Sequence, residues 1–361
     1  MADLGPSVLV IGAGIIGASA AYALQKAGAR VKIIDDGAEV ATAASFGWIN
    51  ASFHHDAAHF RLRAVGLEAW DRLGRALELP IAWQGTLCWE ETGAAFDAQR
   101  DQLVALGYAV EEVDAATFAA LEPHVTDPPA RALYFKQEAS VDSIAATRTL
   151  LDGALAAGAQ RLRGLRVEGV VEQGDRITGI RTQAGLLHAD HVLIAAGTGS
   201  GALMAQAGAA LPMVRRPALM LRTRPIRPVL THILVSEFGE LRQLADGSLL
   251  MPAAVDHQGD TAESVGDDLE RTAAQVMTRL RSLLPDLPLE WEELTLAHRP
   301  VPQDGLPVLG AVRAGLHVAC MHSGITLGAL AGEMVAQEML EGVSNRSGAL
   351  LAPYRPERFK E

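Results

Sequence analysis

Residues 8–17 read Val8-Leu-Val-Ile-Gly12-Ala-Gly14-Ile-Ile-Gly17, and this stretch decides the fold. Its apolar start predicts a buried strand, and three glycines follow with the spacing Gly-x-Gly-x-x-Gly. Each glycine removes a side chain that would collide with a tight turn, a bound pyrophosphate or the packed sheet. The Ala-rich stretch up to Gly28 then predicts a helix whose first amides and positive dipole end face an anion.

A second apolar strand, Val31-Lys-Ile-Ile-Asp35, completes this unit. Asp35 lies 23 residues beyond Gly12, close to the distance of ~20 residues at which an acid binds the ribose of a dinucleotide. A strand, a glycine turn, a helix, a second strand and a terminal acid therefore predict a dinucleotide site. A buried strand and helix that use glycine only for packing would leave Asp35 unexplained.

The composition excludes several classes of protein. The 361 residues are enough for two closely joined domains, and the net charge of -12 argues against nucleic acid or an anionic membrane as the main partner. The two cysteines, Cys88 and Cys320, lie far apart, so we expect neither a disulfide framework nor a metal site, and a cytoplasmic location. The uncharged residues 7–25 are interrupted by the glycines, so we expect no membrane span and no signal peptide.

Nucleotide-like segments return twice, later in the chain. A buried strand at residues 189–198 ends in a glycine turn and is expected to join the N-terminal sheet. Between this strand and the tail, residues 218–253 predict four exposed strands. Residues 268–284 predict an amphipathic helix that lies across an antiparallel sheet. The tail resumes the first pattern, with a strand at residues 316–320 and a helix from Ile325.

This interleaving predicts the cofactor and the architecture. A nicotinamide enzyme usually has one contiguous nucleotide domain, whereas three separate pieces suit FAD, which lies across the sheet and is held at both ends. We predict an α/β protein in which a Rossmann-like FAD-binding domain is interleaved with an α+β substrate domain built on an antiparallel sheet. The FAD-binding parts are expected at residues 1–80, 136–215 and 296–361, and the substrate parts at residues 81–135 and 216–295.

Over nearly its whole length the chain resembles the D-amino-acid oxidase superfamily of flavoproteins, which contains glycine oxidase and monomeric sarcosine oxidase. The N-terminal motif alone fits many flavin families, so its combination with the tail motif makes the resemblance specific. The residues that match are Gly12, Gly14, Gly17, Asp35, the loop Ala43-Ala-Ser-Phe-Gly47, the strand Val192 to Thr198, the motif Arg299-Pro-x-x-x-Asp304-Gly-x-Pro307, and Gly324-Ile325.

The resemblance implies noncovalent FAD and a set of residues around it. The turn would bind the pyrophosphate, an acid the adenosine ribose, a backbone group the adenine, and a loop and the start of the last long helix the isoalloxazine ring. The helix amides would stabilise negative charge on the reduced ring, whereas the plain alternative is an ordinary helix capped by Ser323. For the pyrophosphate, the implied residues are Gly12, Gly14, Ile15, Ile16 and Gly17, with Ala196 and Gly197 nearby. For the ribose they are Asp35 or Asp36, and for the adenine Val167. For the isoalloxazine ring they are Ser45, Phe46, Gly47 and Trp48 in the loop, and Ser323, Gly324, Ile325 and Thr326 at the start of the helix.

Arg299 is the candidate for the substrate, because a guanidinium in a proline-stiffened loop binds a carboxylate through two parallel hydrogen bonds. The matching arginine of glycine oxidase has this role. A structural ion pair with Asp304 or Glu292 is the alternative. Trp48 is expected beside an apolar pocket, and Arg242 and Met251 are expected either to line that pocket or to pack in the sheet.

The implied reaction is the oxidation of a D-amino acid, glycine or an N-alkyl amino acid. Hydride leaves the alpha carbon for flavin N5, and water hydrolyses the resulting imine. Oxygen or another electron acceptor completes the cycle, and the sequence has no lysine between Lys136 and Lys360 to promote the reaction with oxygen. Two alternatives stay open: a flavin subunit that passes electrons to a partner, and an NAD-dependent dehydrogenase. A homo-oligomer also stays open.

Overall fold

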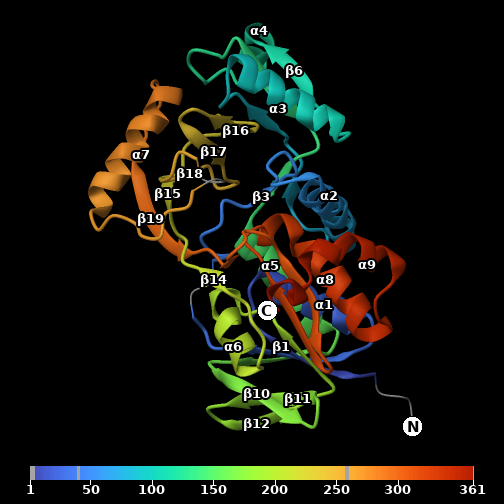
Figure 1. The fold of residues 1–361 in the computed structure, drawn as a ribbon. Helices are drawn as coiled ribbons and strands as arrows, with labels where there is room; N and C mark the ends of the chain where they lie inside the picture. The colour runs from blue at the N-terminus through green and yellow to red at the C-terminus, as the bar shows by residue number, and fades with distance from the viewer. Residues whose placement is uncertain (1–4, 39–40, 257–259, 361) are drawn as a thin grey trace.

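The N-terminal strand lies in a sheet whose other strands come from distant parts of the chain. The computed structural model describes residues 5–38, 41–256 and 260–360 (Figure 1). The strands of this six-stranded sheet are, in spatial order, β21 (Val308–Arg313), β22 (Leu316–Cys320), β13 (His191–Ile194), β1 (Ser7–Ile11), β2 (Arg30–Asp35) and β9 (Gln160–Arg163). All neighbours are parallel except β21 and β22. The expected pairing of the strand near residue 192 with the N-terminal strand is confirmed.

Alternate residues of this sheet enter two different cores, as the period of a strand requires. Val8 and Val10 belong to one core, which contains residues of helices α1 (Ile15–Lys26), α5 (Ser143–Ala156) and α8 (Gly324–Glu341). Leu9 and Ile11 belong to the other core. The elements on that side are β10 (Val167–Gln173), β11 (Arg176–Thr182), β12 (Gly185–His188) and α6 (Ser200–Gln206). Figure 1 shows helices on one side of the sheet and the β10–β12 layer on the other.

Helix α2 (Ala57–Leu77) packs against α8 and begins at an aspartate cap. The Asp56 carboxylate accepts a hydrogen bond from the His59 backbone N–H at 2.7 Å, as a helix cap does. The remaining short elements of this half are β3 (Trp48–Ile49), β4 (Ile81–Ala82), β8 (Ala139–Val141), β14 (Met213–Val214), β20 (Val301–Pro302), α9 (Asn345–Leu351) and the 3₁₀ turns Gly197–Gly199, Ala352–Tyr354 and Pro356–Phe359.

A second sheet of eight strands forms the other half of the molecule. Its strands are, in spatial order, β19 (Trp291–His298), β15 (Pro217–Thr223), β18 (Leu249–Pro252), β17 (Gly239–Gln243), β16 (Ile233–Ser236), β5 (Thr86–Cys88), β7 (Arg131–Phe135) and β6 (Glu111–Asp114). It is antiparallel as predicted, apart from one parallel pair, β16 with β5. The amphipathic helix α7 (Leu269–Leu283) covers one face, where Val276 and Leu280 join the core of the sheet.

The prediction of exposed strands is wrong for β15, β16, β17 and β18. Nearly every residue in these strands is buried. The reason is that α7 covers one face while alternate residues such as Val235 and Leu250 join the first core on the other face. The division of the chain into numbered domains stays a prediction.

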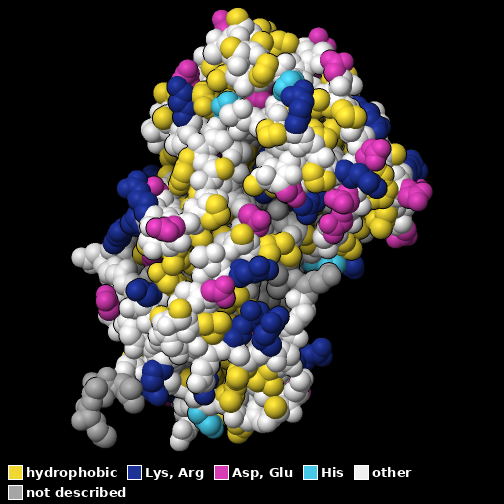
Figure 2. Space-filling view, turned by 180° about the vertical axis from the view of Figure 1, so that it is seen from behind, with side chains coloured by type: hydrophobic (Ala, Val, Ile, Leu, Met, Phe, Trp, Pro, Cys, Tyr) yellow, Lys and Arg dark blue, Asp and Glu magenta, His cyan; other side chains and the backbone are white. Residues whose placement is uncertain are grey.

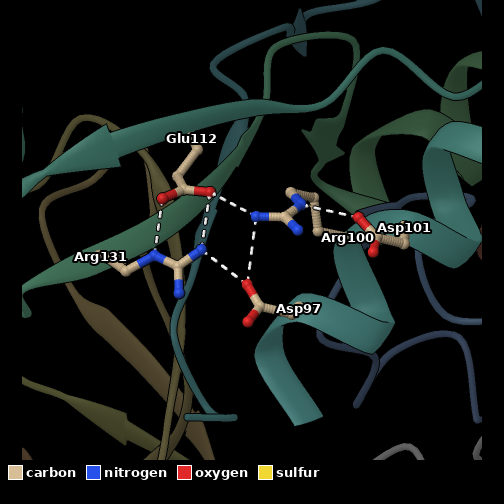
Figure 3. A network of polar contacts seen from close by, with 5 residues as sticks. All are labelled: Asp97, Arg100, Asp101, Glu112 and Arg131. Atoms are coloured by element: carbon tan, nitrogen blue, oxygen red, sulfur yellow. Dashed lines mark hydrogen bonds and ion pairs between the residues drawn. The ribbon is translucent and has the colours of Figure 1, made fainter. Parts of the chain in front are cut away.

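An exposed ion-pair network ties the outer edge of the eight-stranded sheet together (Figure 3). It joins α3 (Gly93–Ala105) to β6 and β7, next to the short helix α4 (Ala115–Leu121). Arg131 binds Glu112 at 2.6 Å and Asp97 at 2.7 Å, and Arg100 bridges the same two acids at 3.0 and 3.1 Å. Asp101 adds a contact to Arg100 at 2.9 Å. We call these five residues the exposed network.

Candidate active site

A cavity of about 1720 Å³ lies between the two sheets. The ends of β1, β2, β13 and β22 form part of its wall, and β15, β17 and β18 of the second sheet contribute another part. In open α/β sheets, ligands bind outside the carboxyl ends of the parallel strands, so this cavity is where a dinucleotide is expected. A smaller cavity of about 110 Å³ shares wall residues with it, among them Ser45, Arg299 and Ile325.

The glycine turn forms a cradle that side chains would fill. Gly12 has a φ of +108°, and a Cβ added there would lie 2.3 Å from the Ala195 carbonyl oxygen. A Cβ on Gly17 would lie 2.0 Å from the Gly12 carbonyl oxygen. Gly12 and Gly14 line the cavity, whereas Gly17 does not and instead lets α1 pack closely on the turn. Gly17 therefore shapes the cradle from behind.

The N-terminal end of α1 faces the cavity through Gly14, Ile15 and Ile16. Its first turn contains no acidic residue, so the positive end of the helix dipole is not offset locally. The Ile15 N–H donates to Thr42 Oγ1 at 3.2 Å, which ties the following loop to the turn. This arrangement fits a pyrophosphate.

The residues expected around the adenosine lie in the same wall. Asp35 and Asp36 follow one another at the end of β2, and Val167, Ala196 and Gly197 also line the cavity. The Asp35 carboxylate accepts from the Gly37 N–H at 2.9 Å and forms an ion pair with Arg161 of β9. These contacts hold the carboxylate in a fixed position at the strand end.

The segment expected beside the flavin ring lines the smaller cavity. Phe46, Gly47 and Trp48 belong to that wall, and Ser45 belongs to both walls. The Trp48 indole is buried and its Nε1–H donates to Glu138 Oε2 at 3.0 Å. Trp48 is therefore a fixed wall residue.

The start of α8 also reaches the cavities. Gly324 and Ile325 line the larger one, and Ser323 and Thr326 line the smaller one. The first turn of α8 has no acidic residue, and the Ser323 hydroxyl makes no capping hydrogen bond. It accepts from Arg63 Nη1 at 2.8 Å instead. The helix end thus has a cation beside it, and an anion in the cavity is the matching ligand.

Arg63 is a residue of this site that the sequence prediction missed. It is buried, and it donates from Nε to the Asn50 carbonyl at 3.0 Å and from Nη2 to Asn50 Oδ1 at 2.6 Å. Burial lowers the pKa of Arg63 to about 10, so the group stays charged at neutral pH. The signal was present in α2, where Phe60, Arg63, Leu67 and Trp70 share one face at helical spacing.

Glu138 was missed as well and is fully buried. It accepts from the Ser52 N–H at 3.1 Å, from the Tyr108 hydroxyl at 2.9 Å and from Trp48. Burial raises the pKa of Glu138. We call Arg63, Glu138 and the groups they bind the buried cluster. Together they fix residues 48–52, which follow the loop beside the smaller cavity.

Arg299 lies in the wall of both cavities, but an acid already occupies its guanidinium. Nη2 forms an ion pair with Asp260 Oδ2 at 2.7 Å, and Nε donates to the Arg216 carbonyl at 3.4 Å. Neither expected partner is the one found, since Asp304 binds Arg358 at 2.7 Å and Asp260 comes from another loop. The guanidinium thus forms an ion pair, as the alternative to a substrate role expected, but with Asp260 as the acid.

Arg242 lines the larger cavity and Met251 does not. The Arg242 side chain is 5% exposed, and its Cζ lies 5.6 Å from the centre of the Phe46 ring. Met251 is 0% exposed and packs in the core beneath α7. Of the two alternatives for Met251, packing in the sheet is the one found, because side chains of a strand alternate and its neighbour Leu250 faces the cavity instead.

Figure 2 shows Lys and Arg side chains gathered near the middle of one face of the molecule. Among the described residues, the wall of the larger cavity contains six arginines and five acids, whereas acids clearly outnumber bases in the whole protein. Among the described residues, no group of three or more His, Cys, Asp or Glu side chains is placed to hold a metal ion. Within the same residues, no helix has the length and apolar character needed to span a membrane.

Known proteins resemble this chain over most of its length. A bifunctional protein ThiO/ThiG of Trichormus variabilis is 28% identical over 63% of this chain, which spans only about a third (34%) of that relative. A glycine oxidase of Pseudomonas putida is 26% identical over 97% of this chain and 98% of its own. The solved glycine oxidase of Geobacillus kaustophilus has the same fold, with a TM-score of 0.84, 23% identity and coverage of 99% of this chain and all (100%) of the other.

The family model for FAD dependent oxidoreductases, DAO, matches residues 7–338. It spans the glycine turn, the strands of both sheets and nearly all of α8. This match sets the NAD-dependent alternative aside. The chain belongs to the DAO family of FAD dependent oxidoreductases.

Proposed function

We propose that the chain oxidises a small amino acid or secondary amine with noncovalently bound FAD. The substrate class is a D-amino acid, glycine or an N-alkyl amino acid. The observation that carries the proposal is one cavity that combines the acid-free N-terminal ends of α1 and α8 with buried arginines. The first features suit a dinucleotide with a ring that becomes negative on reduction, and the arginines suit a carboxylate. The similarity to glycine oxidase supports the same reading.

The residues present fit FAD along the whole cavity. Gly12, Gly14 and the first amides of α1 would hold the pyrophosphate, and Asp35 or Asp36 would hold the ribose. The Val167 backbone would meet the adenine, and residues 45–48 would flank the ring. When bound, FAD supplies the hydride acceptor, N5 of its ring, and passes the electrons to oxygen or another acceptor.

The protein's own part in the reaction is binding and orientation. Arg299 would hold the substrate carboxylate by exchanging Asp260 for it, because both ligands are carboxylates. Apolar wall residues such as Met220, Leu250 and Ile325 favour the neutral amine, since a low dielectric disfavours charge. Loss of hydride from the alpha carbon and of the amine proton leaves an imine, which water cleaves to an oxo acid and an amine.

A spectrum and a substrate panel test this function. We expect the purified protein to show the visible absorbance of a flavin, and acid precipitation to release that flavin as FAD. D-amino acids, glycine and N-alkyl glycines, assayed with oxygen and with an artificial acceptor, are expected to give the corresponding oxo acids. A protein that stays colourless after addition of FAD would reject the proposal. Turnover only with an added partner protein would assign the chain as one subunit of a larger dehydrogenase.

Arg299 has its own test within the same assay. Arg299→Ala is expected to keep FAD and to raise KM for carboxylate substrates by about tenfold or more, since a charged hydrogen-bond partner is lost. Unchanged KM and kcat would leave Arg299 with a structural role only.

A further inference from the structure

Arg242 is a buried cation in the cavity wall that no carboxylate contacts among the described residues. It is 5% exposed, and its Nε has no hydrogen-bond acceptor within the described part of the chain. Nη2 reaches the Val141 carbonyl at only 3.5 Å, the outer limit for a hydrogen bond. A buried guanidinium with unused donors is costly, so the cavity beside it is expected to take an anion.

Within the described residues, the groups around Arg242 do not satisfy the charge and the hydrogen-bond donors of its guanidinium. The Phe46 ring lies 5.6 Å from its Cζ and offers a weak cation–π contact only. Asp142 is the acid that acts on it electrostatically, but Asp142 Oδ1 is the cap of α5 and accepts from the Ile144 and Ala145 N–H groups at 2.9 Å each. Burial lowers the pKa of Arg242 to about 10, and the group stays charged at neutral pH.

Three other arginines of the same wall differ from Arg242 because they have acidic partners. Arg299 binds Asp260, Arg222 binds Asp246, and Arg216 lies 3.5 Å from Glu263. Among the described residues, Asp260, Arg216 and Glu240 act electrostatically on Arg299, and Asp142 acts on Arg242. The two arginines therefore have separate electrostatic surroundings.

Resting on the proposed function, we propose that Arg242 binds a second acidic group of the substrate, so that the cavity selects amino acids or N-alkyl amino acids with two carboxylates. Arg299 orients the carboxylate next to the reacting carbon, and Arg242 binds the other one from strand β17. The strand holds the guanidinium beside Gly47, where an added Cβ would lie 2.6 Å from Nη2. Gly47 thus leaves room for the Arg242 guanidinium and the Val141 carbonyl, and a larger residue there would displace the guanidinium.

Matched substrate pairs test the assignment in the intact flavoprotein. The pairs are D-aspartate with D-asparagine, and N-(carboxymethyl)glycine with its monoamide, which differ by one charge at nearly equal size. We expect kcat/KM to favour at least one diacid by about tenfold or more over its amide in the natural protein. In Arg242→Met this preference is expected to fall to about twofold or less, and Arg242→Lys is expected to restore part of it. Arg222→Met is the control, because Arg222 lies in the same wall but is paired with Asp246.

A binding experiment separates this inference from the proposed function. Malonate and acetate are titrated against the protein, and binding is followed by tryptophan fluorescence, which needs no turnover. Tighter binding of malonate that Arg242→Met abolishes supports the subsite even if no amine is oxidised. FAD content and thermal unfolding show whether each variant is folded, and Arg242→Gln, which also removes the charge, serves if the methionine variant is not. Equal use of diacid and amide by the natural protein, or a preference that survives in Arg242→Met, overturns the inference. Equal loss of both members of a pair would also overturn it, since Arg242 would then bind the single carboxylate.

Discussion

The buried cluster and the exposed network are both sets of charged side chains, but different forces govern them. Burial lowers the pKa of Arg63 and raises that of Glu138, so desolvation is the largest influence on each. In the exposed network, hydrogen bonds from Arg131 lower the pKa of Glu112 to about 2, and Glu112 raises the pKa of Arg131. Charged partners have the largest effect on the pKa values of the exposed groups, and burial has the largest effect on the pKa values of the buried groups.

The difference teaches what each set does for the protein. Exposed ion pairs gain little because water and salt screen them, so the exposed network adds modestly to the edge of the sheet. Buried charges rarely add net stability, yet removing one partner is costly because the others stay buried. The buried cluster therefore fixes residues 48–52 and the start of α8 next to the cavity. Each prediction below changes one side of this comparison.

Arg63→Met is expected to have the largest effect. It removes the donors to Asn50 and Ser323 and leaves their oxygens buried, which lowers the free energy of unfolding by about 3 kcal/mol. Chemical denaturation measures the loss, and titration with FAD is expected to show weaker binding. Arg72→Met on the exposed face of the same helix is the control. Equal stability of the two variants would contradict the assigned role of Arg63.

Glu138→Gln is expected to cost about 2 kcal/mol although the side chain keeps its size. Both Glu138 oxygens accept hydrogen bonds, so an amide NH₂ in either position would face a donor such as the Trp48 indole or the Tyr108 hydroxyl. Glu112→Gln in the exposed network is the matched control and is expected to change stability far less. The near-UV circular dichroism of Trp48 should change only in the first variant. Equal effects of the two changes would remove the distinction between the two sets.

The buried His59 tests the effect of burial through the pH dependence of stability. Burial lowers the pKa of His59 to about 2, and its Nδ1 accepts from the His55 N–H at 3.2 Å. The unfolded chain binds a proton below about pH 6.5 that the folded chain does not, so stability falls as the pH falls through that value, by about 1 kcal/mol per pH unit. His59→Asn is expected to flatten the dependence between about pH 6 and about pH 5. The same change at the exposed His188 serves as control, and parallel curves for the two variants would reject the assignment.

Arg131→Met is expected to have the smallest effect. It removes the contacts to Glu112 and Asp97, which lie in water at the edge of the sheet. We expect a small drop in the thermal midpoint at low salt that vanishes in about 1 M salt, where the screening length is ~3 Å. A large drop that salt does not change would show that the exposed network resembles the buried cluster after all.

The sequence predicted the parts of the fold that depend on local pattern. The glycine turn, α1 and the strand ending at Asp35 follow one another within 35 residues, so their spacing alone indicated a dinucleotide unit. The joining of β13 to β1 followed from an equally plain signal, a buried strand that ends in a glycine turn.

The features of the site that the sequence left open or missed depend on contacts between distant parts of the chain. Met251 and Leu250 are both apolar, and only the position of α7 decides which one packs beneath that helix and which one lines the cavity. The pairing of Arg299 with Asp260 joins residues that no local pattern relates. Glu138 reads as a polar residue in a turn until the fold surrounds it with donors.

The order of the strands in the first sheet has a consequence for biosynthesis. Val8 of β1 pairs with His191, and Val192 of β13 pairs with Leu316. Although β1 also pairs with the nearby β2, one edge of β1 and then one edge of β13 stay open until these distant strands are translated. Contacts this distant slow folding and leave apolar strand edges open to aggregation, which makes the nascent chain a candidate for chaperones. Gly12 also needs Ala195 to complete its turn. The glycine cradle is thus among the first segments to leave the ribosome, but its turn is complete only after residue 195 has been translated.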